Sequence, residues 1–190
     1  MSAAKSFIII IILIALNLKN SNAGVSFDKN KCTIDIEIQS SLSVNELLNI
    51  FFNTDSLKKT VINVDEIKVL EKKENEYLVE YSFKYLNYKN KATYLRKLLA
   101  EKGKIELELK SYTQNTNSIP RMLISKGYFQ FTDNGRARTI HFFRETYFDK
   151  KPGEMDRIFM KEQTEKYSIE LTSYIRKLEK QSGKKKPKRK

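Results

Sequence analysis

The sequence predicts an α+β domain in which a strongly curved antiparallel sheet wraps around one long C-terminal helix. Three observations favour this fold class. A strand pattern and two short helices begin the domain, a period-two pattern then runs for about 85 residues from Val64, and a helical pattern follows it. The expected order is one strand, two helices, six strands and one helix, with about seven strands in all. The domain is expected to span 31–182, after a short N-terminal lead at 24–30.

Residues 1–23 have the pattern of a secretory signal peptide, with cleavage expected after Ala23. Lys5 supplies an early positive charge, 7–16 are apolar, and the segment ends in small or polar residues. A retained membrane anchor is the alternative. Ten apolar residues at about 1.5 Å each would cover only about half of a roughly 30 Å hydrocarbon core. The sequence therefore predicts an exported protein, either periplasmic or extracellular.

The chain is basic, with a formal net charge of +13, and much of this charge lies in a C-terminal tail at 183–190. Six basic residues occupy its end: Lys184, Lys185, Lys186, Lys188, Arg189 and Lys190. Without them and the signal peptide the domain carries about +5, which is ordinary for a soluble domain. The tail is interpreted as a disordered, solvated extension. Contact with an anionic membrane surface, or nonspecific contact with nucleic acid, stays open.

The first predicted strand is "CTIDIEIQ" at 32–39. Ile34, Ile36 and Ile38 alternate with polar residues, as expected of a strand with one buried face. Cys32 is the only cysteine of the chain, which excludes an internal disulfide. We expect it to be a small buried side chain.

Two short helices are predicted next. In "SVNELLNIFF" at 43–52, Ser43 and Glu46 form a capping box, and apolar residues recur at helical spacing. In "TDSLKKTVIN" at 54–63, Asp55 is the expected N-cap of the second helix.

Six further strands follow, separated by turn residues. Strict alternation, as in "KIELELKS", indicates strands with one apolar face, and "DNG" before the last strand is a strong hairpin signal. The segments are "VDEIKVLEK" (64–72), "YLVEYSFKYL" (77–86), "ATYLRKLLA" (92–100), "KIELELKS" (104–111), "RMLISKGYFQF" (121–131) and "RARTIHFFRETYF" (136–148).

Pro152 and Gly153 then end the sheet, and a long helix is predicted over 154–181, with Gly183 as its stop. Its apolar stripe would cover the apolar face of the sheet. The stripe consists of Met155, Phe159, Tyr167, Leu171, Tyr174, Ile175 and Leu178.

The order of elements resembles that of the START-like, polyketide cyclase/dehydrase-like and Bet v 1-like (SRPBCC) superfamily. The phrases "SVNELLNIFFNTDSLKKTVINVDEIKVLE" and "KGYFQFTDNGRARTIHFF" carry the resemblance, which covers 31–178. It implies the helix-grip fold, with a cavity between the sheet and the C-terminal helix. It also implies a binding protein for a lipid or other hydrophobic small molecule, and the signal-peptide pattern makes this an exported one. The protein is expected to be a monomer. A cyclase- or hydrolase-type enzyme, or a protein-interaction module with a collapsed cavity, remains the alternative.

The expected cavity wall follows from the apolar faces of the strands and of the long helix. The candidates are Tyr81, Phe83, Tyr85, Tyr94, Arg96, Leu98, Leu107, Leu109, Phe129, Phe131, Ile140, Phe142, Arg144, Phe159, Tyr167, Leu171 and Tyr174. The same set could instead be plain hydrophobic core, since core and cavity wall are one surface in such a fold.

Two arginines fall on otherwise apolar faces. A two-residue Asn-Gly hairpin loop would pair Ser125 with Arg144, and a tight Lys-Gly turn would pair Arg96 with Leu109. An unpaired buried guanidinium is costly, so each must meet a carboxylate, water or an acidic ligand group. The hypothesis is that one of them orients an anionic or polar head group. In the alternative, a bulge or a position at the rim sends the side chain to solvent.

Neither a catalytic residue, a cofactor nor a metal ion is predicted. His141 is the only histidine and is expected on the outer face of the sheet, and no His-Cys-carboxylate cluster suits zinc. The stretch "KGYFQF" at 126–131 begins like an RNA-recognition strand, but Phe129 and Gln130 and the order of elements do not fit that domain. Specific nucleic-acid binding is therefore not expected.

Overall fold

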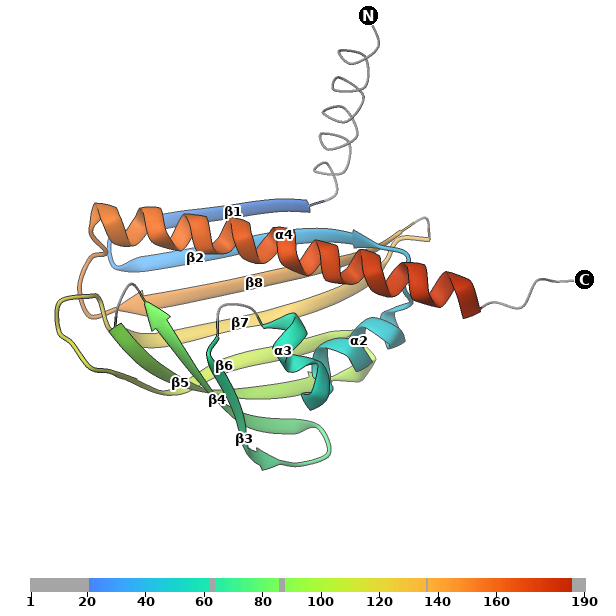
Figure 1. The fold of residues 1–190 in the computed structure, drawn as a ribbon, viewed down its shortest axis with the longest axis horizontal. Coiled ribbons are helices and arrows are strands. Elements are labelled where there is room, and N and C mark those ends of the chain that lie inside the picture. The colour runs from blue at the N-terminus through green and yellow to red at the C-terminus, as the bar shows by residue number, and fades with distance from the viewer. Residues whose placement is uncertain (1–20, 62–63, 86–87, 136, 186–190) are drawn as a thin grey trace, which may run out of the picture.

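One antiparallel sheet of eight strands forms the body of the protein, in the order β1-β2-β8-β7-β6-β5-β4-β3 (Figure 1). The computed structural model describes residues 21–61, 64–85, 88–135 and 137–185. The strands are β1 (Ser21–Asp28), β2 (Lys31–Ser40), β3 (Glu66–Lys72), β4 (Glu76–Tyr85), β5 (Tyr88–Leu99), β6 (Lys104–Gln114), β7 (Met122–Asp133) and β8 (Arg138–Phe148). The helices are α2 (Val44–Phe52), α3 (Leu57–Thr60) and α4 (Glu154–Lys185), with 3-10 turns η2 (Thr54–Ser56) and η3 (Ala100–Lys102). The predicted α+β class is confirmed.

The sheet has one strand more than expected, because most of the segment expected as a lead forms β1. This strand pairs with β2 from Ser21↔Ile38 to Asp28↔Lys31, and its alternating apolar side chains, such as Val25, pack against the core. The expected cleavage point after Ala23 lies within β1. The apolar run of the expected signal peptide lies outside the described residues, so export stays a prediction.

The predicted helix start at Ser43 is confirmed. Its hydroxyl accepts a hydrogen bond from the Glu46 N–H at 3.3 Å, and the Glu46 carboxylate accepts one from the Ser43 N–H at 2.8 Å. The apolar side of α2 is buried against the sheet, including Phe51, which is 0% exposed. The cap of the next turn was predicted wrongly. Asn53, and not Asp55, caps η2, because its side-chain oxygen reaches the Asp55 N–H at 2.8 Å.

Both predicted turns were too short by two residues. At the β7–β8 hairpin, Asp133 pairs with Arg138, so Ser125 faces Thr146 instead of Arg144. The Asp133 carboxylate accepts hydrogen bonds from the Gly135 N–H at 2.8 Å and the Arg138 guanidinium at 2.9 Å, which holds the longer loop together. A shift of two residues leaves every side chain on its predicted face.

The same correction applies between β5 and β6. The turn η3 lengthens the connection and ends at Gly103, whose φ of 58° suits glycine. Arg96 consequently faces Leu107 instead of Leu109. Its predicted face is again preserved.

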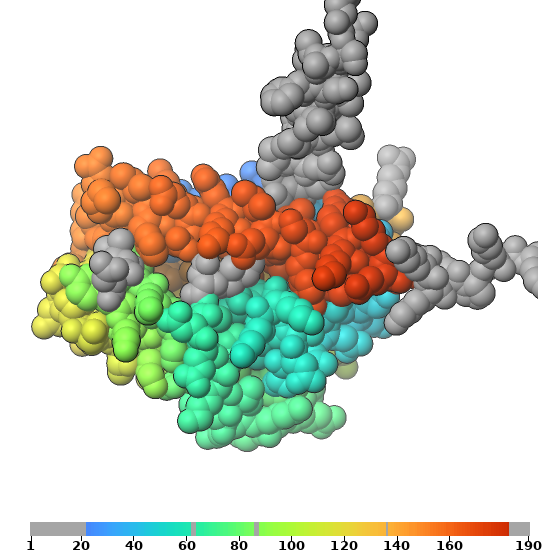
Figure 2. All heavy atoms as spheres, in the orientation of Figure 1, coloured from blue at the N-terminus to red at the C-terminus, as the bar shows by residue number. Residues whose placement is uncertain are grey.

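The long helix α4 lies along β1 and β2 across the concave side of the sheet, while α2 and α3 cover another part of that side (Figure 1). In the space-filling view α4 runs above α2 and α3 across this face (Figure 2). Leu171 and Ile175 of α4 are fully buried, whereas Met155, predicted on the apolar stripe, is 68% exposed. The helix also continues past Gly183 to Lys185, so this glycine does not end it. Lys186–Lys190 of the expected tail lie outside the described residues.

No helix in the described part of the chain combines the length and the apolar composition needed to cross a bilayer.

Candidate functional site

A cavity of about 280 Å³ lies between the concave side of the sheet and α4. Strands β2, β4, β5, β6, β7 and β8, the segment after α3, the loop before β7 and the first half of α4 all contribute to its wall. The lining is mainly apolar: Phe129, Phe142 and Phe148 come from the last two strands, and Phe159 and Met160 come from α4. A concave site of this kind, apolar with a few polar groups, is typical of small-molecule binding.

The charged groups on the wall are all positive. They are Lys84, Arg96 and Arg144, and within the described ranges neither a carboxylate nor a histidine lines the cavity. Lys84 is exposed to solvent, whereas Arg96 is only 2% exposed. The wall thus favours an occupant that is neutral or negatively charged.

Arg96 is anchored to the fold. Its Nη2 donates a hydrogen bond of 2.6 Å to the carbonyl of Phe51, in the last turn of α2, and its Nη1 lies 3.4 Å from the Tyr81 hydroxyl. A cation at this place also interacts favourably with the C-terminal end of the helix. The predicted face of Arg96 is therefore confirmed, and the alternative that it turns to solvent is wrong.

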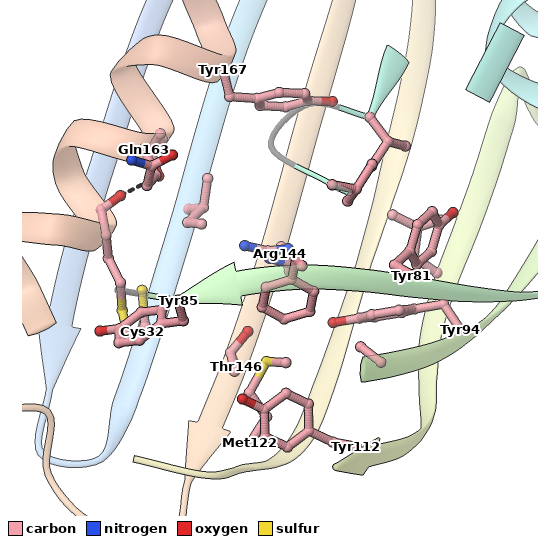
Figure 3. A pocket seen from close by; sticks show the side chains of 18 of the residues that line it. Cys32, Tyr81, Tyr85, Tyr94, Tyr112, Met122, Arg144, Thr146, Gln163 and Tyr167 are labelled. Atoms are coloured by element: carbon pink, nitrogen blue, oxygen red, sulfur yellow. Dashed lines mark hydrogen bonds between the residues drawn. The ribbon is translucent and has the colours of Figure 1, made fainter. Parts of the chain in front are cut away.

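Arg144 has no such anchor. Its side chain extends from β8 into the middle of the cavity (Figure 3). Its buried Nε has no hydrogen-bond partner, and none of the described residues forms an ion pair with its guanidinium. The contact that the group does make is with the ring of Phe142, whose centroid is 5.9 Å away. The N–H donors of the Arg144 guanidinium therefore have no hydrogen-bond acceptor among the described residues.

Several tyrosines supply neutral polar groups. The hydroxyl of Tyr167 donates to the Thr60 carbonyl at 3.0 Å, which ties α4 to α3. Burial raises the pKa of Tyr167, and the charges of Arg96 and Arg144 oppose this shift. Burial likewise raises the pKa of Tyr112 to about 12. These phenols therefore stay protonated at neutral pH and act as hydrogen-bond donors.

The hydroxyl of Tyr85 also forms a hydrogen bond that links α4 to another element, near the start of the helix. It donates to the Asp156 carboxylate at 2.9 Å, joining the end of β4 to α4. Together with the Tyr167 contact, this bond holds α4 against the opposite wall of the cavity. Figure 3 shows the Tyr94 hydroxyl pointing toward the space around Arg144, and this hydroxyl has no hydrogen bond to any described residue.

Cys32 lies on the wall as well, and its predicted burial is confirmed at 3% exposure. Burial raises the pKa of its thiol, and the nearby charge of Arg144 opposes this effect. The thiol is therefore mostly protonated at neutral pH, which does not favour a nucleophilic role.

Eleven of the seventeen predicted residues lie on the cavity wall, and a role in ligand contact stays a prediction for each of them. They are Tyr81, Phe83, Tyr85, Tyr94, Arg96, Leu107, Phe129, Phe142, Arg144, Phe159 and Tyr167. The other six belong to the hydrophobic core around it: Leu98, Leu109, Phe131, Ile140, Leu171 and Tyr174. They share the predicted faces but lie farther along the strands and the helix.

Other wall residues were not predicted. They include Cys32, Ile34, Val61, Val64, Lys84, Ala92, Tyr112, Ile119, Pro120, Met122, Thr146, Phe148, Met160, Gln163 and Thr164. Ile34, Thr146 and Phe148 were detectable, since each lies on the apolar face of its predicted strand. Ile119 and Pro120 come from a loop, where no periodicity marks a side chain as inward.

The only histidine of the chain lies outside the cavity. His141 lies on the outer face as predicted, with its Nε2 2.9 Å from the Asp35 carboxylate and its ring against Tyr128. No cluster of histidine, cysteine and carboxylate side chains in the described part of the chain could hold a metal ion.

Fold and cavity together define a helix-grip domain, in which a curved sheet wraps around a long helix and an apolar cavity lies between them. Comparison with known proteins gives no match to a family model and none to a curated protein sequence. Solved structures do match. The ZhuI aromatase/cyclase from Streptomyces has a TM-score of 0.61 at 9% identity, over 76% of this chain and 91% of that one.

Two further structures show the range of the likeness. A STAR-related lipid transfer protein from Xanthomonas axonopodis gives a TM-score of 0.59 at 10% identity, over 81% of this chain and 98% of that one. The ginseng major latex-like protein 151 gives 0.56 at 6% identity, over 79% and 98%. The chain therefore has the helix-grip fold of the START-like (SRPBCC) superfamily, as its sequence predicts.

Proposed function

We propose that this chain is an exported binding protein that carries or senses a lipid or other hydrophobic small molecule in the cavity beneath α4. The observation that carries the proposal is the cavity itself, about 280 Å³ with a mainly apolar wall. An interaction module with a collapsed cavity would not need such a space. The fold is shared with a lipid transfer protein, which supports a ligand of this general kind.

Binding is favoured over catalysis by the chemistry of the wall. An acid–base enzyme needs a group that can exchange a proton near neutral pH. The described wall has neither a carboxylate nor a histidine, and burial raises the pKa values of Cys32, Tyr112 and Tyr167. The polar groups are therefore better suited to orienting a ligand than to transferring protons.

Binding of a neutral apolar fluorophore, N-phenyl-1-naphthylamine, tests the proposal. Met160 lies half-buried on the wall, so Met160→Trp should fill part of the cavity and weaken binding about tenfold or more. Ile169 is 53% exposed on the same helix, so Ile169→Trp adds the same side chain outside the cavity and should leave binding unchanged. Equal affinity in both variants, or no binding by the unmodified chain, would contradict the proposal.

The proposal also includes export and a role for the basic tail, and both depend mainly on residues outside the described ranges. The apolar run at 7–16 supports export, and the six basic residues at 184–190 support contact with an anionic membrane. Flotation with anionic liposomes, with and without 184–190, tests the second point, because equal partitioning would remove the role of the tail. The chain is proposed to act as a monomer.

A further inference from the structure

The cavity arginines differ from three other described arginines in having no acidic partner among the described residues. Arg121, Arg138 and Arg176 each lie within 3.9 Å of a carboxylate oxygen. Arg96 and Arg144 make no ion pair with any described residue. In addition, the Nε of each is buried without a hydrogen bond. Withdrawing a cation from water without pairing it with an anion is costly, and no described residue neutralises the positive charge of these two side chains.

Of the two, Arg144 is free to bind an added anion. Arg96 already donates to the Phe51 carbonyl at 2.6 Å and lies near the Tyr81 hydroxyl. The guanidinium of Arg144 has only the face of the Phe142 ring, and it projects into the centre of the cavity (Figure 3). The planar fork of donors on a guanidinium suits a carboxylate, which it can bind through two parallel hydrogen bonds.

A second donor faces the same space. The Tyr94 hydroxyl points toward the region around Arg144 and is not used by any described residue (Figure 3). Hydrogen bonds from arginine and tyrosine to one oxygen-containing head group would satisfy donors that are otherwise unpaired. Phe129 and Phe142, which also line the wall, would cover the apolar part of the same molecule.

The size of the cavity limits what that molecule can be. A volume of about 280 Å³ lies just below the roughly 300–1,000 Å³ common for ligand pockets. The space suits a single acyl chain or a compact ring system and is too small for a phospholipid with two acyl chains.

We propose that the ligand is a compact amphiphile with one anionic oxygen head group, in the simplest case a carboxylate, and that Arg144 binds this head group. The inference rests on the proposed binding function and adds the chemical class of the ligand and the residue that selects it. The lining supports it in two ways, because its charges are all positive and its one unanchored guanidinium projects into the cavity.

Displacement of N-phenyl-1-naphthylamine by decanoate and by methyl decanoate tests the inference. The two compounds share an acyl chain and differ in the charge of the head group. The unmodified chain should bind decanoate about tenfold or more tightly than methyl decanoate. Equal affinities would overturn the inference and leave the proposed function standing. If neither the fluorophore nor either compound binds, both fail.

Substitution then tests the role of Arg144. In Arg144→Gln the affinity for decanoate should fall about tenfold or more, to the level of the ester, while the ester and the fluorophore change by less than about threefold. Arg138→Gln is the matched control, since it removes a charge from the same strand at a site paired with Asp133 outside the cavity. An undiminished preference for decanoate in Arg144→Gln, or an equal loss in Arg138→Gln, would overturn the assignment to Arg144.

Discussion

Replacing Phe51 with alanine is expected to lower the free energy of unfolding by about 3 to 5 kcal/mol. Phe51 is 0% exposed, and its ring centroid lies 4.9 Å from that of Phe129 and 5.2 Å from that of Phe131. Alanine would leave a void where α2 meets the sheet. The backbone carbonyl that receives the Arg96 hydrogen bond would remain, so the loss measures packing alone.

Urea denaturation followed by circular dichroism gives the measurement. Asn49→Ala is the control, because Asn49 is exposed on the same helix and alanine favours the helix, so its stability should change by less than about 0.5 kcal/mol. A loss below about 1 kcal/mol in Phe51→Ala would show that the contact between α2 and the sheet is not part of the core.

Gly127→Ala should lower the free energy of unfolding by about 2 to 3 kcal/mol, because the added methyl group has no room. A Cβ at Gly127 would lie 2.4 Å from the Phe143 carbonyl oxygen and 3.0 Å from the Arg144 Cα. Both are backbone atoms, so β7 and β8 would have to move apart beside Arg144. The same variant should therefore bind decanoate more weakly, if Arg144 holds the head group.

Gly24→Ala is the matched control for this prediction. It also lies in a strand, but its Cβ would come only within 3.8 Å of the Asp35 carbonyl oxygen, which is an ordinary contact. Its thermal midpoint should stay close to that of the unmodified chain. If Gly127→Ala were equally stable, the close approach of β7 and β8 at this point would be contradicted.

The faces of the strands could be predicted from sequence, whereas their register could not. Both turn predictions failed by two residues, yet Arg96 and Arg144 kept their predicted side of the sheet because side chains alternate with a period of two. The loop after β7 depends on how the Asp133 carboxylate bonds to Gly135 and Arg138, which local composition does not determine.

The partners within the site depend on contacts between distant segments. Arg96 bonds to the carbonyl of Phe51, a residue 45 positions away, and no periodicity indicates which backbone carbonyl an inward arginine will reach. The strand β1 was missed for another reason. Its alternation of Ala23, Val25 and Phe27 is visible in the sequence, but it overlaps the end of the expected signal peptide.

Native mass spectrometry of the chain, purified without detergent and followed by extraction of the bound material, tests the central claim most directly. The account predicts one small molecule per chain, which is a compact amphiphilic acid. This molecule should be lost in Met160→Trp and retained in Ile169→Trp. A chain that carries no bound molecule and takes up neither N-phenyl-1-naphthylamine nor decanoate would contradict the account.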